Sequence, residues 1–234
     1  MRAWGGSCLW CVWLLSAAGC GTRQVTIAIV APRIAPTKSS VAWSEPFDTL
    51  SLKRWREVTI RGRTAYQATI LGDRHCLQAQ SQAGASILLS AVRIDPHTYP
   101  WLSWDWRVDE LVKDEALDRK EGSDASARVY VYFETHGLPW QKRNLDYVWS
   151  VSLPIGTMIN SPFQSTSKIL VVESGSGALG QWRSVRRNLV DDYRRAFGTR
   201  PPRIIAIGLM SDTDSAGGQA LAYFDELRIG RAAE

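Results

Sequence analysis

Cysteine and histidine are scarce in this chain of 234 residues. It contains four cysteines and three histidines, which are His75, His97 and His136. No two histidines stand at a spacing typical of metal ligands, and none has a nucleophile motif nearby. The Gly-x-Ser-x-Gly, His-Glu-x-x-His and phosphate-loop patterns are also absent. The sequence therefore gives little support to catalysis, apart from a pair of carboxylates, since such a pair is defined by distance and not by sequence.

Internal repeats and low-complexity segments are missing as well. The chain is 45% hydrophobic and 22% charged, with a formal net charge of +5 and an isoelectric point of about 9.2. These values exclude a disordered, collagen-like or coiled-coil chain, and the length fits one large domain or two small ones. Eleven tryptophans are present. Tryptophan at this density is typical of a β-rich core or of aromatic platforms for ligands.

The one long apolar run opens the chain. Arg2 precedes residues 3–18, which carry no charge but are too few for a comfortable transmembrane helix of about 20 residues. Small residues then lead to Cys20, in an order and spacing that resemble the signal peptide and lipobox of bacterial lipoproteins. We expect a signal peptide over residues 1–19 and lipidation of Cys20. An ordinary signal peptide and an uncleaved anchor are the alternatives.

The mature chain would keep one cysteine that is not lipidated, Cys76, so no intramolecular disulfide could form. Its strand-like surroundings predict a buried, inert thiol in preference to a reactive one. Acyl chains on Cys20 would hold the protein at the membrane. Gly21, in place of an Asp, favours the outer membrane, on the periplasmic face of the cell envelope. Residues 20–40 are typical of a tether, although the run 25–30 could instead pair as an edge strand.

From residue 41 onward the hydrophobic pattern has a period of two, as in half-buried strands. In residues 101–109 the apolar face includes Trp104 and Trp106, which we expect in the core. In residues 127–134 the opposite face carries Arg128, Tyr130 and Tyr132, and Arg128 could form a planar, bidentate pair with a carboxylate, in a structural role. Further strands are expected over 145–151, 168–173, 203–211 and 219–229, and weaker ones near 55–60, 65–70, 75–80 and 86–94. Nine to eleven strands predict an all-β fold, a jelly-roll β-sandwich over residues 41–234.

One short helix is expected near residues 188–197. Asn188 is a good N-cap, Asp191 and Asp192 lie in the first turn, and Gly198 is a suitable terminator. The charged stretch 110–124 is expected to form a surface excursion between two strands, with room for a short helix.

Four segments together resemble a known family. They are residues 99–108, 124–131, 174–198 and 206–214, and their order and spacing over about residues 43–230 are similar to an uncharacterised bacterial exported family, domain of unknown function 3047. One departure is Ser215, which stands where Asn is expected. The resemblance implies no particular activity.

A second resemblance is to galactose-binding-like jelly rolls, the architecture of many carbohydrate-binding modules. It rests on the segment 46–48 and on the closing strand 223–229, which contains Asp225 and Glu226. The resemblance implies a structural calcium site that would involve Asp225, with Asp48 as a further candidate. An inward carboxylate on this strand needs a partner, because burial of an unpaired charge is costly. Either calcium or an arginine could supply it.

The loop 211–218 places Asp212 and Asp214 two residues apart beside glycines. Calcium takes oxygen ligands from such loops, although the EF-hand pattern is not satisfied. The alternative is a solvated turn in which Asp caps backbone amides. If the protein is a glycan hydrolase, these two residues are the first candidates for its carboxylate pair.

Basic and aromatic residues supply further candidates for ligand binding. Arg187 belongs to an arginine-rich stretch, 183–203, that would suit an anionic glycan, a phosphate or a lipid headgroup, or would form a solvated basic face. Trp140 and Arg143 share a polar loop, where Trp140 could stack on a sugar ring or fold over the edge of the sandwich. No nucleic-acid motif accompanies these residues, so we expect no nucleic-acid partner.

These observations favour a lipid-anchored, non-catalytic domain that binds a saccharide or an acidic polymer of the cell envelope. A glycan hydrolase that uses Asp212 and Asp214 is one alternative, and an envelope assembly or interaction factor with a protein partner is another. No cofactor is expected beyond a possible structural calcium ion.

Overall fold

The computed structural model describes residues 40–135 and 142–232. The expected signal peptide, Cys20, the tether before Ser40 and Trp140 lie outside the described residues, so those expectations stay predictions. Within the described ranges, no helix is long and apolar enough to cross a membrane.

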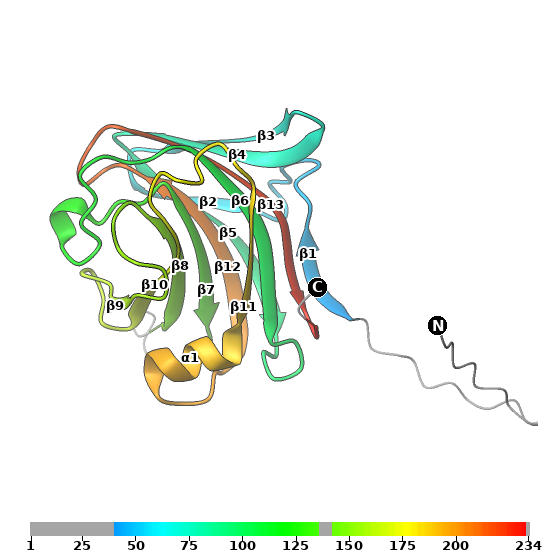
Figure 1. Cartoon of the computed structure of the whole chain (residues 1–234). Coiled ribbons are helices and arrows are strands. Elements are labelled where there is room, and N and C mark those ends of the chain that lie inside the picture. Colours follow the sequence, from blue (N-terminus) through cyan, green and yellow to red (C-terminus); the bar gives the residue numbers. More distant parts are fainter. Residues whose placement is uncertain (1–39, 136–141, 233–234) are drawn as a thin grey trace, which may run out of the picture. The chain divides into compact units, whose positions relative to one another are not determined.

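The described chain forms two β-sheets (Figure 1). The six-stranded sheet has the order β11-β6-β13-β4-β3, and β1 pairs with β13. Its strands are β1 (Val41–Glu45), β3 (Thr64–Leu71), β4 (Arg74–Gln82), β6 (Trp101–Glu110), β11 (Arg183–Asn188) and β13 (Gln219–Gly230). The seven-stranded sheet has the order β2-β5-β12-β7-β8-β10-β9. Its strands are β2 (Arg56–Arg61), β5 (Ala85–Ile94), β7 (Ala127–Phe133), β8 (Asn144–Ser150), β9 (Met158–Asn160), β10 (Ser167–Ser174) and β12 (Ile204–Asp212). All pairings are antiparallel except that of β8 with β10.

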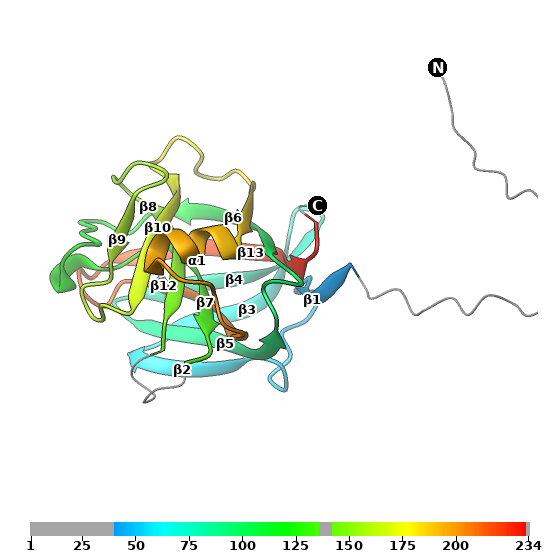
Figure 2. The ribbon, with the colours of Figure 1, turned by 90° about the horizontal axis from the view of Figure 1, so that it is seen from below.

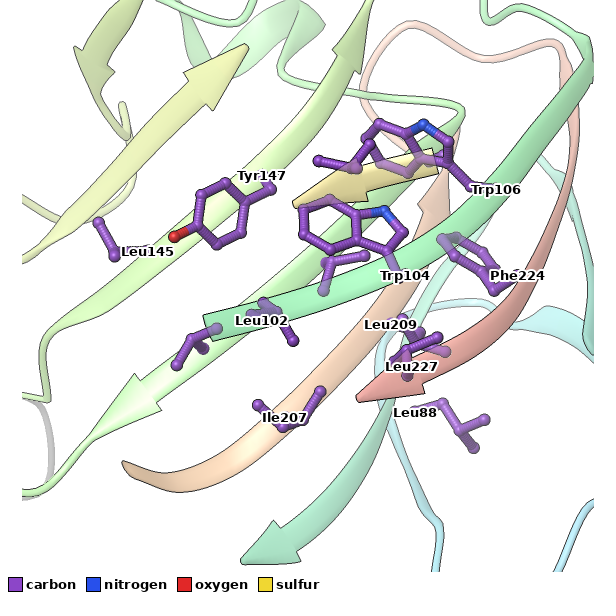
Figure 3. Close-up of a cluster of buried hydrophobic side chains, with 14 of the residues drawn as sticks. Leu88, Leu102, Trp104, Trp106, Leu145, Tyr147, Ile207, Leu209, Phe224 and Leu227 are labelled. Atoms are coloured by element: carbon purple, nitrogen blue, oxygen red, sulfur yellow. The ribbon is translucent and has the colours of Figure 1, made fainter. Parts of the chain in front are cut away.

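The chain passes back and forth between the sheets, and the apolar faces of both sheets enclose one main core. Trp104 and Trp106 on β6 point across it toward β8 (Figure 3). The ring centroids of Trp104 and Tyr147 lie 5.4 Å apart, and those of Trp106 and Trp149 lie 5.9 Å apart. The expected all-β jelly-roll sandwich and its tryptophan core are therefore confirmed. Cys76 is fully buried, as expected, and burial raises the pKa of its thiol to about 11.

The helix α1 (Leu189–Phe197) lies across one open end of the sandwich (Figure 2). The side chain of Asn188 accepts hydrogen bonds from the amides of Val190 and Asp191, and Gly198 ends the helix in the left-handed conformation. Leu189 and Tyr193 are buried in the main core. The predicted helix is confirmed, because its capping signals are local to the sequence. Between β6 and β7 the described chain has one short 3-10 helix, η1 (Lys120–Gly122).

The described residues contain thirteen strands, more than the nine to eleven expected. The unexpected ones are β1, β9 and β11. Strands β1 and β9 are short, with five and three residues. The arginines of β11 leave it without the apolar row that predicts a strand. β11 lies at the edge of the six-stranded sheet, where charged side chains keep an open strand edge from pairing with other chains. Part of the arginine-rich stretch 183–203 is thus an edge strand.

Candidate functional site

The outer face of the seven-stranded sheet carries the side chains that point away from the core on β7. These are Arg128, Tyr130 and Tyr132, the row that the period-two pattern placed opposite the apolar face. Tyr130 stands beside Asp146 of β8 on one side and Gly208 of β12 on the other. The rings of Tyr130 and Tyr132 are stacked, with centroids 5.7 Å apart and an interplanar angle of 22°.

Gly208 allows this face to pack closely. A Cβ atom at Gly208 would lie 2.9 Å from Cδ1 of Ile87, 3.0 Å from Cδ2 of Leu89 and 3.2 Å from Cβ of Tyr130. A side chain at this position would displace the ends of Ile87 and Leu89 and crowd Tyr130, so Gly208 lets the three side chains approach over β12. Together with Met210 they form a small apolar cluster on the outside of the sheet.

A cavity of about 670 Å³ opens above this cluster, which we call the tyrosine pocket. Its floor comes from β7, β8 and β12, and its walls come from residues 120–123, 161–167 and 212–215. Ile60 and Phe163 line it as well, although they are 59% and 61% exposed. The volume lies within the range of about 300–1,000 Å³ that is usual for small-molecule sites.

Arg128 organises the polar side of the tyrosine pocket. Its side chain is only 3% exposed. Nε donates to Oδ1 of Asp212 at 2.8 Å, Nη1 donates to Oδ2 of Asp146 at 2.6 Å, and Nη2 donates to the carbonyl of Ser123 at 2.8 Å. The expected pairing of Arg128 with a carboxylate is confirmed, but the expected bidentate geometry is wrong. The guanidinium contacts two carboxylates, from β8 and β12, through one nitrogen each.

Asp212 is also held by the backbone amide of Ala125, which donates to Oδ1 at 3.1 Å. Burial raises the pKa of Asp212 to about 7; Arg128 opposes the shift, and the nearby Asp124 adds to it. Burial likewise raises the pKa of Asp214, and the charge of Asp124 contributes. These carboxyls therefore hold their protons to a higher pH than an exposed aspartate does.

Asp124, Asp212 and Asp214 form a group whose nearest oxygens all lie within 4.8 Å of one another. Asp124 accepts hydrogen bonds from the amides of Ser215, at 3.1 Å, and Ala216, at 2.6 Å. The loop is thus a turn whose amides are capped by an aspartate, although the capping residue comes from another segment. Calcium would have to share these oxygens with the amide donors and Arg128, and a calcium ion here stays a prediction.

Asp225 lies on the outside of the other sheet and belongs to no such group among the described residues. Arg74 pairs with both Asp225 and Asp105, and its guanidinium stacks on the ring of Trp182 at 4.2 Å. Of the two partners that the sequence left open for Asp225, the structure contains the arginine. Asp48, the other metal candidate, is exposed.

Arg187 and Arg143 lie near α1 and do not line the tyrosine pocket. Nε of Arg187 donates to Oδ2 of Asp192 at 2.9 Å, which ties β11 to the helix. Nη1 of Arg143 lies 3.2 Å from the hydroxyl of Tyr193, beside a separate cavity of about 480 Å³. Of the described ligand-binding candidates, only Asp212 and Asp214 meet in the tyrosine pocket.

The sequence did not single out Asp146, Asp124 or the two tyrosines as site residues. The sequence contained an indication of the tyrosines, because they alternate with the apolar row of β7 and therefore lie on its outer face. The indication of Asp146 was weaker: it is an acidic residue between the core positions Leu145 and Tyr147. A carboxylate in the middle of a buried strand needs a partner, but the identity of that partner depends on the pairing of strands.

Comparisons with solved structures find proteins of similar fold at low identity. The family 11 carbohydrate-binding module of a cellulosomal cellulase of Clostridium thermocellum is 12% identical, with 84% of this chain and 98% of that chain covered and a TM-score of 0.42. A xylan-binding domain from Paenibacillus barcinonensis is 13% identical, with 84% and 97% covered and a TM-score of 0.40. A cellulase derived from that of Rhodothermus marinus is 9% identical, with 75% and 99% covered and a TM-score of 0.41. These values are too low to carry over a ligand or a reaction.

Among curated proteins, none matches the chain in sequence. The family described as protein of unknown function, DUF3047, matches residues 53–228. This match spans well over half of the chain and contains the whole tyrosine pocket. The chain therefore belongs to the DUF3047 family.

Proposed function

We propose that this protein is a non-catalytic saccharide-binding domain that a lipid on Cys20 holds at the cell envelope. The observation that carries the proposal is the tyrosine pocket, where two stacked aromatic rings lie beside buried hydrogen-bonding groups. A sugar ring has apolar C–H faces and a polar rim of hydroxyls. It can therefore lie against Tyr130 and Tyr132 while its hydroxyls reach Asn144 and Asp146.

Exposed apolar side chains at the rim support the same function. Phe163 and Ile60 expose more than half of their surface at the mouth of the pocket. Apolar groups of this size beside a polar cavity often mark a binding site. They would extend the apolar contact beyond the two tyrosines.

Thermal unfolding of the purified chain against a panel of saccharides tests the proposal. A sugar present at 100 times its Kd adds about 2.7 kcal/mol, which corresponds to roughly 5–11 °C in Tm for a domain of this size. Phe163→Ala should reduce the shift. Ile155→Ala is the matched control, because Ile155 is 62% exposed and lies outside the pocket. A panel without any shift, or equal shifts in both variants, contradicts the proposal.

A glycan hydrolase that uses Asp212 and Asp214 is the second candidate, favoured by the pKa of Asp212, which is about 7 and suits a general acid. Such enzymes need environments that push the two pKa values apart. Here burial raises the pKa of both carboxyls, and Oδ1 of Asp212 already accepts from Arg128 and from the amide of Ala125, which favours a structural role for Asp212 over turnover. Release of reducing ends that is lost in the Asp212→Asn/Asp214→Asn double variant would establish the hydrolase.

The assembly-factor alternative predicts a protein partner in place of a sugar. A protein that co-purifies with the chain and is retained after loss of the tether would support it. Retention of that protein by Tyr132→Ala would place its contact outside the tyrosine pocket.

A further inference from the structure

Asp146 leaves one oxygen without a partner inside the tyrosine pocket. The residue is 2% exposed and lines the cavity. Its Oδ2 accepts from Arg128, but no described residue donates a hydrogen bond to Oδ1. A buried acceptor without a donor is unfavourable, and a native structure that keeps one needs an explanation.

No neighbouring donor has good geometry toward Oδ1 of Asp146. Three of the five N–H groups of the Arg128 guanidinium donate to other oxygens, and Nδ2 of Asn144 donates to Oγ of Ser167 at 2.8 Å. The hydroxyl of Tyr130 lies near enough to Asp146 for a hydrogen bond that opposes the rise of its pKa, but it also faces Sδ of Met210 at 3.7 Å and leaves Oδ1 without a well-aligned donor. Since Asp146 lines the cavity, a bound molecule can supply that donor.

The charges of the pocket restrict what that molecule can be. The pocket is lined by four carboxylates, Glu121, Asp146, Asp212 and Asp214, and by three bases, Arg61, Lys120 and Arg128. Arg61 and Lys120 are exposed, and the deep base, Arg128, is already paired with two carboxylates. An acidic group next to Asp146 would meet like charges and no free cation, although the chain as a whole is basic, with a net charge of +5.

We propose that the saccharide of the tyrosine pocket carries no acidic group and that one of its hydroxyl or ammonium groups donates a hydrogen bond to Oδ1 of Asp146. This inference rests on the proposed function and narrows it. Of the two ligand classes that the sequence left open, it selects neutral and amino sugars over acidic polymers. Asp146 acts as the specificity-determining residue because, in the carboxylate form that Arg128 stabilises, Oδ1 accepts hydrogen bonds and cannot donate them.

The test uses the full chain and isothermal titration with four tetrasaccharides. The neutral probes are the tetramers of β-1,4-glucose and of N-acetylglucosamine, the cationic probe is the glucosamine tetramer, and the acidic probe is the galacturonic acid tetramer. We expect at least one neutral or cationic probe to bind at least tenfold more tightly than the acidic probe. Their separate titrations tell a hydroxyl donor from an ammonium donor.

Asp146→Asn is the diagnostic variant. The Asn carbonyl can still accept from Arg128, while its NH₂ group replaces the free oxygen, so an acceptor becomes a donor. We expect at least a tenfold loss of affinity for the preferred probe. Asp109→Asn, in an ion pair on the other sheet, should bind normally. Thermal unfolding shows whether each variant is folded.

The outcomes separate the two claims. Preferential binding of the acidic probe to the unmodified chain overturns this inference, whatever the variant does, but leaves the proposed function standing. Normal binding by a folded Asp146→Asn chain also overturns this inference alone. If no probe binds, the proposed function fails and this inference fails with it.

Discussion

The outer faces of the two sheets each place one arginine between two aspartates, but only one of these clusters has a buried carboxylate oxygen without a donor. On the six-stranded sheet, Arg74 pairs with Asp105 and Asp225, and the amide of Glu226 donates to the remaining oxygen of Asp225 at 2.7 Å. Trp182 covers the guanidinium, and Asp105 is 20% exposed, so water reaches it. On the seven-stranded sheet, Arg128 pairs with Asp146 and Asp212, and Oδ1 of Asp146 is buried beside a cavity without a partner among the described residues.

This difference separates a structural ion pair from a candidate binding site. Both clusters satisfy the arginine, so the arginine does not distinguish them. What distinguishes them is whether each carboxylate oxygen has a protein donor or access to water. Asp105 and Asp225 meet this condition, whereas Oδ1 of Asp146 is buried without a donor and keeps hydrogen-bonding capacity for a ligand.

The largest effect is expected from removal of Arg128. Arg128→Met would leave two buried carboxylates without their cation, and breaking a buried pair in this way typically costs about 3–5 kcal/mol. Arg74→Met should cost less, because the side chains of Arg74 and Asp105 are 27% and 20% exposed and water can solvate them, which leaves Asp225, at 5%, as the one buried partner. Urea unfolding of both variants measures the difference. Equal losses would mean that the two clusters do not differ in burial energetics.

The second effect is a pH dependence that comes from Asp212. Its folded pKa is about 7, above the value of about 3.9 in an unfolded chain. Between these two values the folded state binds the proton more tightly than the unfolded state does. The stabilisation that comes from the protonated Asp212 is complete below about pH 4 and is lost as the pH rises to 7. The free energy of unfolding falls over this interval by at most about 1.4 kcal/mol per pH unit.

Asp212→Asn should make the free energy of unfolding vary less between pH 4 and 7. The amide oxygen of Asn can still accept from Arg128 and Ala125, so the geometry is kept. Urea unfolding at several pH values provides the measurement, with Asp109→Asn as the control. A slope unchanged from the parent chain would show that Asp212 does not titrate in this range.

The third effect concerns ligand binding. Tyr132→Ala removes one of the two stacked rings. It should lower the affinity for the preferred tetrasaccharide about tenfold, which corresponds to about 1.4 kcal/mol of binding free energy. Trp182→Ala removes an aromatic ring from the outer face of the other sheet and should leave the affinity unchanged. Isothermal titration compares the two variants. Weakening by Trp182→Ala alone would move the site to the six-stranded sheet.

The smallest effect is expected from Trp182→Ala on stability. The ring covers Arg74 at 4.2 Å, and such a contact at a partly exposed site contributes about 0.5–1 kcal/mol. Thermal unfolding should show a Tm lower by a few degrees at most. A loss as large as that of Arg128→Met would mean that the Arg74 cluster is the more important of the two.

Much of the fold could be predicted because its signals are local. The period-two rows of β6 and β7 identify the face that enters the core, and Asn188 and Gly198 mark the ends of α1. These signals act within a few residues and need no knowledge of the rest of the chain. The strand β11 was not predicted, because Val185 is its one buried position and polar or charged residues surround it. Its pairing with β6 is a long-range contact.

The candidate site was only partly predictable, because its residues come from distant segments. The composition of their loop predicted Asp212 and Asp214 as site residues, whereas no sequence pattern predicted Asp124 or Asp146. Asp146 reaches Arg128 because β7 and β8 pair in a register that sets Tyr130 opposite Asp146. A shift by one residue would turn Asp146 to the other face.

By itself, the sequence determined ten of the thirteen described strands, the core tryptophans and the helix, because periodicity and capping act at short range. The same sequence supports the expectation of a lipid anchor, through the order of charge, apolar run and Cys20. Only the tertiary structure decided that Asp225 has an arginine partner. It also decided that Asp146, which lines a cavity, has one buried oxygen without a hydrogen-bond donor among the described residues. Strand order and register select the neighbours of a buried charge, and neither is encoded within a single strand.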